Sequence, residues 1–299
     1  MWFPLSLLAM LCWSFSDLFS KIGSRPEDKY SHWKMVMAVG LVMGLHAAYE
    51  IFVGHVPIDM QVILSYLPAS LLYISSMILG YAGLRYIELS VSSPICNSSG
   101  ALAAILCFLF LQQTLAGGQL CGVILVCLGV IGLGVVESRE NLELKEERRQ
   151  SQNVKYQRSF LALLLPLLYC LLDAAGTFAD AFILDTGILA EEPANVAYEL
   201  TFLFMGILAF IYVKLIKRQL LLPRREGPKL VAALFETAGQ FAYVFAISAN
   251  AIAAAPVICA YCMVSVLWSR IFLKEKLSWK HYLMILLTVA GIVIMGFFE

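Results

Sequence analysis

Apolar stretches long enough to cross a lipid bilayer recur along the whole chain. A helix of about 20 mainly apolar residues spans the hydrocarbon core of a bilayer. Ten such stretches can be read, at residues 2–20, 33–53, 62–84, 91–111, 118–137, 159–181, 194–213, 229–248, 251–273 and 279–298. They are continuous apolar blocks and lack the period-two alternation of membrane-barrel strands. The sequence therefore predicts an all-α integral membrane protein with ten transmembrane helices.

The composition excludes an ordinary soluble protein. Apolar residues make up 61% of the 299 residues and charged residues 14%, whereas a soluble domain has roughly 45–50% and about 25%. The 21 Lys and Arg balance the 21 Asp and Glu, so the charge balance indicates no nucleic-acid partner. The N-terminus lacks the basic segment and small-residue cleavage site of a signal peptide, and the first stretch is expected to remain as a membrane helix.

All eight cysteines lie inside apolar stretches rather than in polar loops. Cys259 and Cys262 have the CxxC spacing of a metal or redox motif, but no second CxxC accompanies them and the four histidines are scattered. Small packing residues within helices are the favoured interpretation. The sequence leads us to expect no metal site and no cofactor.

Each connection between predicted helices is numbered by the helix that precedes it. All Lys and Arg residues then fall in odd-numbered connections. The even-numbered connections and both termini carry none of the 21 basic residues. Because cytoplasmic loops are enriched in Lys and Arg, the odd connections are predicted to be cytoplasmic and both termini to lie outside. The predicted location is the plasma membrane, which the chain crosses several times.

The two halves of the chain repeat each other. The residue pairs related by a shift of 162, or of 156 in the first helix, include Tyr81/Tyr243, Pro94/Pro256, Gly129/Gly291, Gly134/Gly296, Trp13/Tyr169 and Asp17/Asp173. Since five helices is an odd number, the second copy is expected to be inverted relative to the first. Inverted repeats are an architecture of secondary transporters, with the site near the middle of the membrane between the repeats. The predicted units are residues 1–137, a charged cytoplasmic linker at 138–158, and residues 159–299.

The last fifty residues resemble the EamA-like branch of the drug/metabolite transporter superfamily. The features that carry the resemblance are an Ala-rich run into Pro256, the motif at residues 272–277 before the last helix, and Gly291 near its end. The first half keeps related positions of the same pattern, namely Tyr81, Pro94, Leu115 and Gly129. The resemblance covers the chain as two five-helix repeats. It implies a carrier whose central cavity is lined by the first four helices of each repeat, with the fifth helix peripheral.

Ionisable side chains within the apolar stretches are the first candidates for function, because a charge inside a membrane is costly. Asp173 has no cation within one helical turn, and Thr177 follows it on the same helix face. Glu236 begins a second polar stripe with Gln240 and Tyr243. These acids are predicted to bind a substrate amine or a proton. The alternative is that they are neutral and hydrogen-bonded between helices.

Three other acids are open to more than one interpretation. Asp17 lies one turn before Lys21, so either an ion pair on one helix face or a binding group is expected. Glu199 lies near the outer end of its stretch, where snorkelling would bring its charge to the membrane surface. Asp180 extends the stripe that begins at Asp173.

Aromatic and small polar residues complete the predicted site. The residues expected to form an aromatic-walled pocket are Trp13, Tyr81, Tyr169, Tyr243, Tyr261 and Trp268. Asn97 adds a small polar group that lines the cavity or allows close helix packing. Because aromatic residues make up 12% of the chain, positions facing lipid or the core are the alternative for most of these rings.

The predicted function is a secondary transporter that moves a small organic metabolite by alternating access, with proton coupling through the buried acids. An exported amino acid or derivative is the first expectation and rests on the resemblance alone, while a sugar, nucleoside or drug-like compound is the alternative. The chain has no GxxxxGK[ST] motif for ATP and no HExxH or GxSxG motif. More distant alternatives are an intramembrane enzyme with Asp17 and Asp173 as a dyad, and a receptor that transports nothing. The oligomeric state is left open.

Overall fold

The computed structural model describes residues 2–25, 27–85, 89–111, 115, 117–150, 160–274 and 277–298. Over these residues the regular structure is entirely helical. The α-helices are α1 (Trp2–Gly23), α2 (Ser31–Phe52), α3 (Met60–Gly83), α4 (Leu89–Asn97), α5 (Ser99–Phe110), α6 (Gly117–Gln150), α7 (Phe160–Asp185), α8 (Glu191–Phe210), α9 (Pro223–Cys259), α10 (Tyr261–Trp268) and α11 (Trp279–Phe297). Two short π-helical segments, Ile211–Ile216 and Ser269–Leu273, extend α8 and α10.

Nine helices in the described part of the chain are long and apolar enough to cross a membrane. One of them, Arg224–Leu273, has 50 residues, more than twice the length that a bilayer core requires. Its backbone is non-helical at Asn250 (φ −167°, ψ 85°), where the sequence predicts the boundary between stretches 229–248 and 251–273. The fold is that of a membrane protein with many apolar helices. The count of ten spans and the inverted relation of the two halves stay predictions.

Two interruptions of the helices occur at positions that the predicted repeat relates. The turn between α4 and α5 lies at Ser98, and the turn between α9 and α10 lies at Ala260, 162 residues later. Each turn comes four residues after a proline, and its backbone N–H donates to that proline's carbonyl oxygen: Ser98 to Pro94 at 3.2 Å and Ala260 to Pro256 at 3.1 Å. This local correspondence agrees with a duplicated unit.

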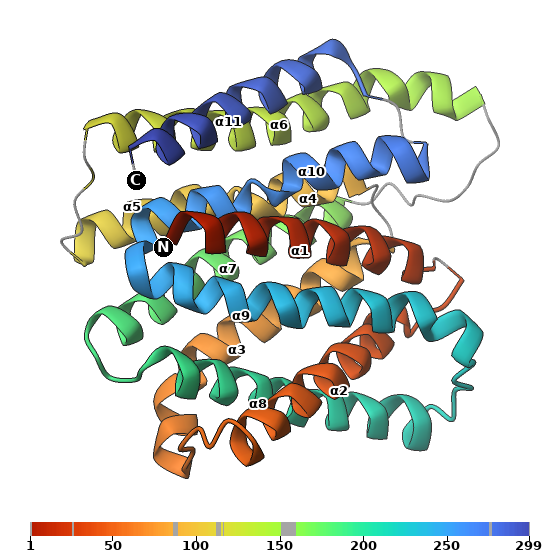
Figure 1. The fold of residues 1–299 in the computed structure, drawn as a ribbon. Helices are drawn as coiled ribbons and strands as arrows, with labels where there is room; N and C mark the ends of the chain where they lie inside the picture. Colours follow the sequence, from red (N-terminus) through yellow and green to blue (C-terminus); the bar gives the residue numbers. More distant parts are fainter. Residues whose placement is uncertain are drawn as a thin grey trace.

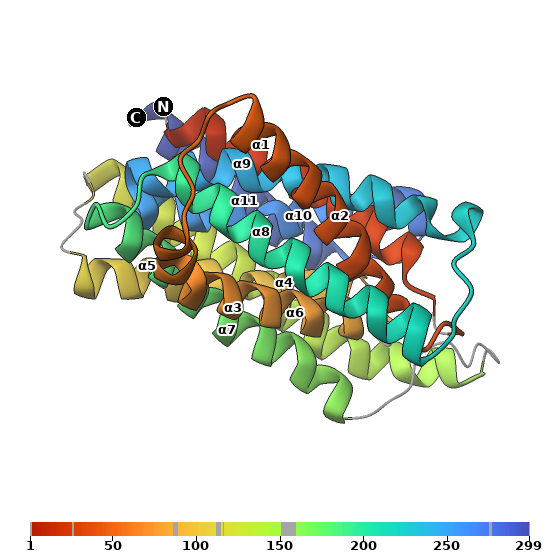
Figure 2. The same ribbon diagram turned by 90° about the horizontal axis from the view of Figure 1, so that it is seen from below.

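The helices pack in pairs that join distant parts of the sequence. Figure 1 shows α6 beside α11 at one edge of the bundle, α1 beside α9 in the middle, and α2 beside α8 at the opposite edge, and Figure 2 shows the bundle from below. Glycine allows the close crossing of α6 and α11, because a Cβ atom on Gly129 would lie 2.1 Å from Thr288 Oγ1. The α6–α11 pair is peripheral, as the resemblance implies for the fifth helix of each repeat.

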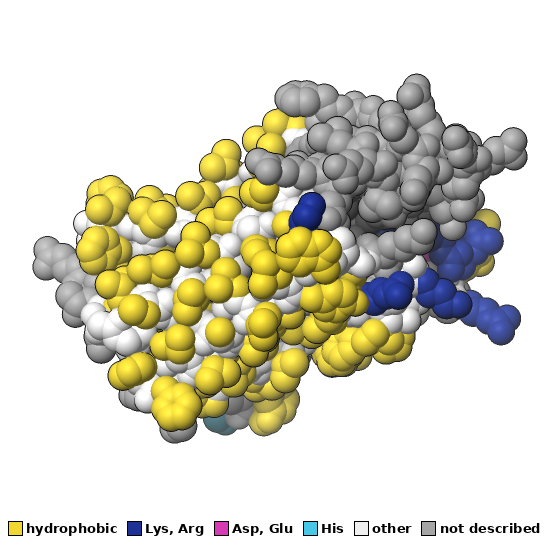
Figure 3. Space-filling model, turned by 90° about the horizontal axis from the view of Figure 1, so that it is seen from above, with side chains coloured by type: hydrophobic (Ala, Val, Ile, Leu, Met, Phe, Trp, Pro, Cys, Tyr) yellow, Lys and Arg dark blue, Asp and Glu magenta, His cyan; other side chains and the backbone are white. Residues whose placement is uncertain are grey.

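The chain termini lie at one end of the bundle, and the Lys and Arg side chains gather toward the other end. The N- and C-termini lie close together at one end (Figure 1), whereas the loops at residues 24–30 and 217–222 lie at the other. On the face drawn in Figure 3, apolar side chains cover most of the surface and the Lys and Arg side chains gather toward that second end. We call the part formed by these two loops and the start of α9 the basic end. Its assignment to the cytoplasm stays a prediction.

Helix α6 is longer than expected. The predicted span ends at residue 137, but the backbone remains helical to Gln150, well into the charged segment that was predicted to be a linker. The residues after Val136 are rich in Glu, Lys and Arg, which have high helix propensity, so the helix continues after the apolar stretch ends. Residues 151–158 of the predicted linker lie outside the described residues.

Candidate functional site

Two adjoining chambers lie inside the bundle. The aromatic chamber is lined by Trp13, Tyr73, Met77, Asn97, Tyr169, Asp173, Thr177, Tyr198, Glu236, Gln240, Tyr243, Ala255, Cys259 and Tyr261. The serine chamber is lined by Ser16, Asp17, Ser20, Met77, Gly80, Tyr81, Leu84, Leu89, Ser92, Ser93, Cys96, Asn97, Tyr169, Glu236 and Tyr261. The residues common to both are Met77, Asn97, Tyr169, Glu236 and Tyr261.

Helices from both halves of the chain form the chambers. The first half contributes α1, α3 and α4, together with Leu84 just after α3, and the second half contributes α7, α8, α9 and α10. Among the described lining residues none comes from α6 or α11, which agrees with the implied peripheral position of these helices. None comes from α2 either, although the resemblance implies that the second helix also lines the cavity.

The structure brings all ten predicted site residues to the chambers. The aromatic chamber alone has Trp13, Asp173, Thr177, Gln240 and Tyr243. The serine chamber alone has Asp17 and Tyr81, and the common boundary has Asn97, Tyr169 and Glu236. Their placement together is a structural finding, whereas their role in binding a substrate or a proton stays a prediction.

Two of the cavity carboxylates are hydrogen-bonded to serine hydroxyls of other helices. Ser99 Oγ donates to Asp173 Oδ2 at 2.7 Å, and Ser16 Oγ donates to Glu236 Oε2 at 2.6 Å. A hydroxyl is both a donor and an acceptor. It therefore keeps a hydrogen bond to the carboxyl group whether that group is ionised or protonated, so the site accommodates both states.

Asp17 also uses hydroxyl partners. Its Oδ2 accepts hydrogen bonds from Ser93 Oγ at 2.5 Å and from Ser265 Oγ at 2.8 Å, on α4 and α10. Lys21, one turn later on α1, donates from Nζ to the carbonyl oxygen of Leu84 at 2.8 Å. Asp17 lines the serine chamber, and its role as a binding group or as the partner of an ion pair stays a prediction.

Tyrosine and tryptophan rings form much of the aromatic chamber. The ring of Trp13 lies 5.1 Å from that of Tyr243 and 5.8 Å from that of Tyr261, measured between centroids. The hydroxyls of Tyr73 and Tyr243 are hydrogen-bonded to each other. Rings from α1, α3, α9 and α10 thus line the same chamber as Asp173 and Glu236.

Two aromatic residues of the chamber were not predicted from the sequence, and a third residue, Trp268, was predicted there wrongly. Tyr73 and Tyr198, whose centroids are 5.9 Å apart, line the aromatic chamber from α3 and α8. The shift of 162 pairs Tyr73 with a phenylalanine, so the repeat gives no signal for it. Trp268 was expected in the pocket but lies outside both chambers, where its ring stacks on Phe15 at 5.0 Å.

Glu199 and Asp180 are buried acids outside the chambers. The snorkelling predicted for Glu199 is wrong, because its side chain is 0% exposed and bonded to His46 Nδ1 at 2.9 Å and to Asn195 Nδ2 at 3.1 Å. His46 reaches it from α2, so the carboxyl group is held between helices. Asp180 Oδ1 accepts a hydrogen bond from Tyr66 Oη at 2.7 Å. The stripe on α7 therefore faces the cavity only through its first two members.

The cysteines are all free thiols. Seven are buried or half-buried and Cys121 is exposed. Cys96 lines the serine chamber and Cys259 the aromatic chamber. Within the described ranges, no group of three or more His, Cys, Asp or Glu side chains is arranged to hold a metal ion.

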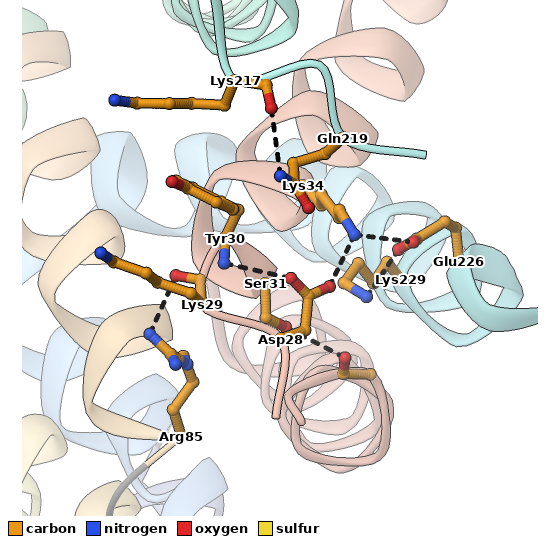
Figure 4. A network of polar contacts seen from close by, with 11 residues as sticks. Asp28, Lys29, Tyr30, Ser31, Lys34, Arg85, Lys217, Gln219, Glu226 and Lys229 are labelled. Carbon is orange, nitrogen blue, oxygen red and sulfur yellow. Dashed lines mark hydrogen bonds and ion pairs between the residues drawn. The ribbon is translucent and has the colours of Figure 1, made fainter. Parts of the chain in front are cut away.

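An ion-pair network lies at the basic end (Figure 4). Lys34 Nζ on α2 lies 2.7 Å from Asp28 Oδ2 and 3.4 Å from Glu226 Oε1, and Lys229 Nζ lies 2.7 Å from Glu226 Oε2. The side chains of Lys34 and Lys229 are only 8% and 2% exposed. We call these four residues the basic clamp. It ties the loop after α1, the start of α2 and the start of α9 together.

The local charges also set the protonation of Asp28. Burial favours its neutral form, but the hydrogen bonds from Lys34 and from the Tyr30 backbone N–H, together with the charges of Lys34 and Lys229, outweigh burial. The pKa of Asp28 is therefore lowered from its usual value of 3.8, and the carboxylate is ionised at neutral pH.

Comparisons with known proteins agree with this architecture. The crystal structure of another protein superposes with a TM-score of 0.64 over 98% of this chain and 96% of that one, at 13% sequence identity. An uncharacterized protein of Methanocaldococcus jannaschii is 29% identical over 133 residues, which are 44% of this chain and 94% of that protein. The profile of the EamA-like transporter family matches residues 1–135 and 162–297. The chain belongs to the EamA-like transporter family.

Proposed function

We propose that the protein is a secondary transporter that moves a small organic metabolite across the cytoplasmic membrane by alternating access. The observation that carries the proposal is that both family-matched segments, 1–135 and 162–297, contribute to one polar cavity inside an apolar bundle. When a site lies between two halves, movement of one half against the other opens it to either side of the membrane in turn.

The basic clamp acts as the closed gate of this cycle. It joins residues from both halves of the chain, because Asp28 and Lys34 belong to the first half and Glu226 and Lys229 to the second. With the basic end on the cytoplasmic side, breaking the clamp exposes the cavity to the cytoplasm. The two termini then lie on the outer side.

Protons drive the transport through the cavity carboxylates. Asp173 and Glu236 have hydroxyl partners that tolerate both protonation states. A carboxyl group that exchanges its proton with one side of the membrane and then with the other couples the proton gradient to the movement of the solute. The proposed direction is export.

The substrate expected from the family is an amino acid or an amino-acid derivative. A sugar, a nucleoside or a drug-like compound is the second candidate class, since the cavity also has amide and hydroxyl groups. Membership of a transporter family favours a carrier over an enzyme or a receptor. The hydrogen bonds also favour a carrier, because Asp17 and Asp173 each bond to serines of their own rather than to each other.

The test is the proton flux of purified protein in proteoliposomes, followed by an internal pH-sensitive dye when amino acids, amines, sugars and nucleosides are added under a pH gradient, and compared with protein-free liposomes. The wild type is expected to give a substrate-dependent proton flux with at least one class. Asp173→Asn and Glu236→Gln keep the shape of each side chain and remove its ionisation, and at least one is expected to abolish this flux while expression and melting temperature stay unchanged.

Matched controls separate this role from a general effect of lost charge. Asp59→Asn changes an exposed carboxylate that caps α3 by accepting the Val62 N–H at 2.8 Å, a bond that asparagine also makes. Glu192→Gln changes an exposed carboxylate at the start of α8. Both are expected to transport normally. Wild-type transport by Asp173→Asn and Glu236→Gln over roughly pH 5.5 to 8 would show that the acids are structural.

A further inference from the structure

The cavity is rich in carboxyl groups. Its described lining has the three carboxylates Asp17, Asp173 and Glu236 and no Lys, Arg or His side chain. The ammonium of Lys21 binds the carbonyl oxygen of Leu84. A buried carboxylate attracts a cation and repels an anion far more strongly than it would in water.

Aromatic faces add to the attraction for a cation. Trp13 lies between Tyr243 and Tyr261, with centroid distances of 5.1 and 5.8 Å, and all three rings line the chamber that holds Asp173 and Glu236. A cation within about 6 Å of such a ring is stabilised by the negative face of the π system. An anion gains no such stabilisation from the ring faces.

An amide donor in the same wall lacks a partner. The side chain of Gln240 is 3% exposed, and its Nε2 atom has no hydrogen-bond partner among the described residues. An unsatisfied buried donor is costly, so an acceptor on a bound molecule is the group that satisfies it. Gln240 lies one turn after Glu236 on α9, and side chains with this spacing are about 5–6 Å apart at Cβ.

We infer that the cavity takes an organic ammonium ion that has no free carboxylate and has a hydrogen-bond acceptor several bonds away from its ammonium group. The inference rests on the proposed function and narrows it, because it replaces a zwitterionic amino acid by the corresponding amine. The ammonium binds between the carboxylates Asp173 and Glu236, and Gln240 donates to the acceptor. A substrate carboxylate about 6 Å from a buried carboxylate weakens binding by about 100-fold at an effective dielectric constant of about 20.

The test is calorimetric binding of three matched sets to the purified wild-type protein. Each set contains an amine, its amino acid and its deaminated acid: tyramine, tyrosine and 4-hydroxyphenylpropionate; tryptamine, tryptophan and indole-3-propionate; and isoamylamine, leucine and 4-methylpentanoate. In the tyramine set, whose phenolic oxygen supplies the acceptor, the amine is expected to bind about 100-fold more tightly than its amino acid, with the acid weakest; the other two sets test the ammonium preference without the acceptor. Equal or tighter binding of the amino acid or the acid in the tyramine set, or no binding of tyramine, overturns the inference.

A second comparison tests Gln240 separately from protein stability. Gln240→Leu removes the donor, so tyramine is expected to bind about tenfold more weakly, which corresponds to about 1.4 kcal/mol. Phenethylamine, which lacks the phenolic oxygen, is expected to bind the variant and the wild type equally. Equal losses for both amines would contradict the assigned role.

The outcomes distinguish this inference from the proposed function. If amino acids bind more tightly than amines and Asp173→Asn still abolishes proton-driven transport, the carrier function stands and the substrate class is wrong. If amines bind but no variant of Asp173 or Glu236 affects transport, the site assignment stands and proton coupling through these groups is wrong.

Discussion

Replacing Lys34 by methionine is predicted to open the basic end without unfolding the protein. Lys34 bridges Asp28 and Glu226 at 2.7 and 3.4 Å and is 8% exposed. Removing one partner of a fully buried pair costs about 3–5 kcal/mol. Because the side chains of Asp28 and Glu226 are 22% and 17% exposed, water screens their charges in part. We therefore expect the removal of Lys34 to destabilise the closed state by about 2 kcal/mol. This value corresponds to about a 30-fold shift from the closed toward the open state.

Hydrogen exchange measured by mass spectrometry checks this shift. Amides of residues 27–34 and 223–232 are expected to lose about 30-fold protection in Lys34→Met, while amides of α6 and α11 are unchanged. Lys214→Met is the matched control, because Lys214 is exposed and outside the clamp. Unchanged protection at the basic end would refute the clamp, and an equal loss in α6 and α11 would mean global destabilisation instead of opening.

Two further predictions concern pH and packing. The pKa of Asp28 is lowered below 3.8 in the folded protein. The Asp28 carboxylate therefore stabilises the fold fully above its unfolded pKa, and this stabilisation is lost as the pH falls through the folded pKa. Hydrogen-exchange protection of residues 27–34 is expected to be constant from roughly pH 5 to 8, and a change of protection within that range would contradict the assignment. Gly129→Ala places a methyl group 2.1 Å from Thr288 Oγ1 and is expected to destabilise the packing of α6 against α11 by about 1–3 kcal/mol. The measurement is the melting temperature, which is expected to fall. An unchanged melting temperature would show that the two helices move apart without cost.

The membrane-spanning segments follow from local features of the sequence. The stretch predicted at 33–53 corresponds to α2 at Ser31–Phe52, because the length of an apolar stretch is enough to identify a membrane-spanning helix. The predicted boundary before residue 251 coincides with the non-helical backbone at Asn250. The extension of α6 to Gln150 was not predicted, because a charged segment of strong helix formers has the same composition as a polar linker.

The site follows from the sequence only in part. Asp173 and Glu236 are recognisable because a charge within an apolar helix is costly. Their partners Ser99 and Ser16 are 74 and 220 residues away, and no local pattern distinguishes these serines from those that only pack. Long-range contacts also explain the error at Glu199, whose partner His46 is 153 residues distant.

Chemical labelling of Cys259 from each side of the membrane tests alternating access around the cavity most directly. This native thiol lines the aromatic chamber and is a free cysteine, so no new residue is needed. A small, membrane-impermeant thiosulfonate is applied to right-side-out and then to inside-out vesicles, and the Cys259 peptide is quantified by mass spectrometry. We predict labelling from both sides, with faster labelling from the basic side in Lys34→Met. Labelling from one side only, or from neither, would contradict a transport cavity that opens alternately to the two sides.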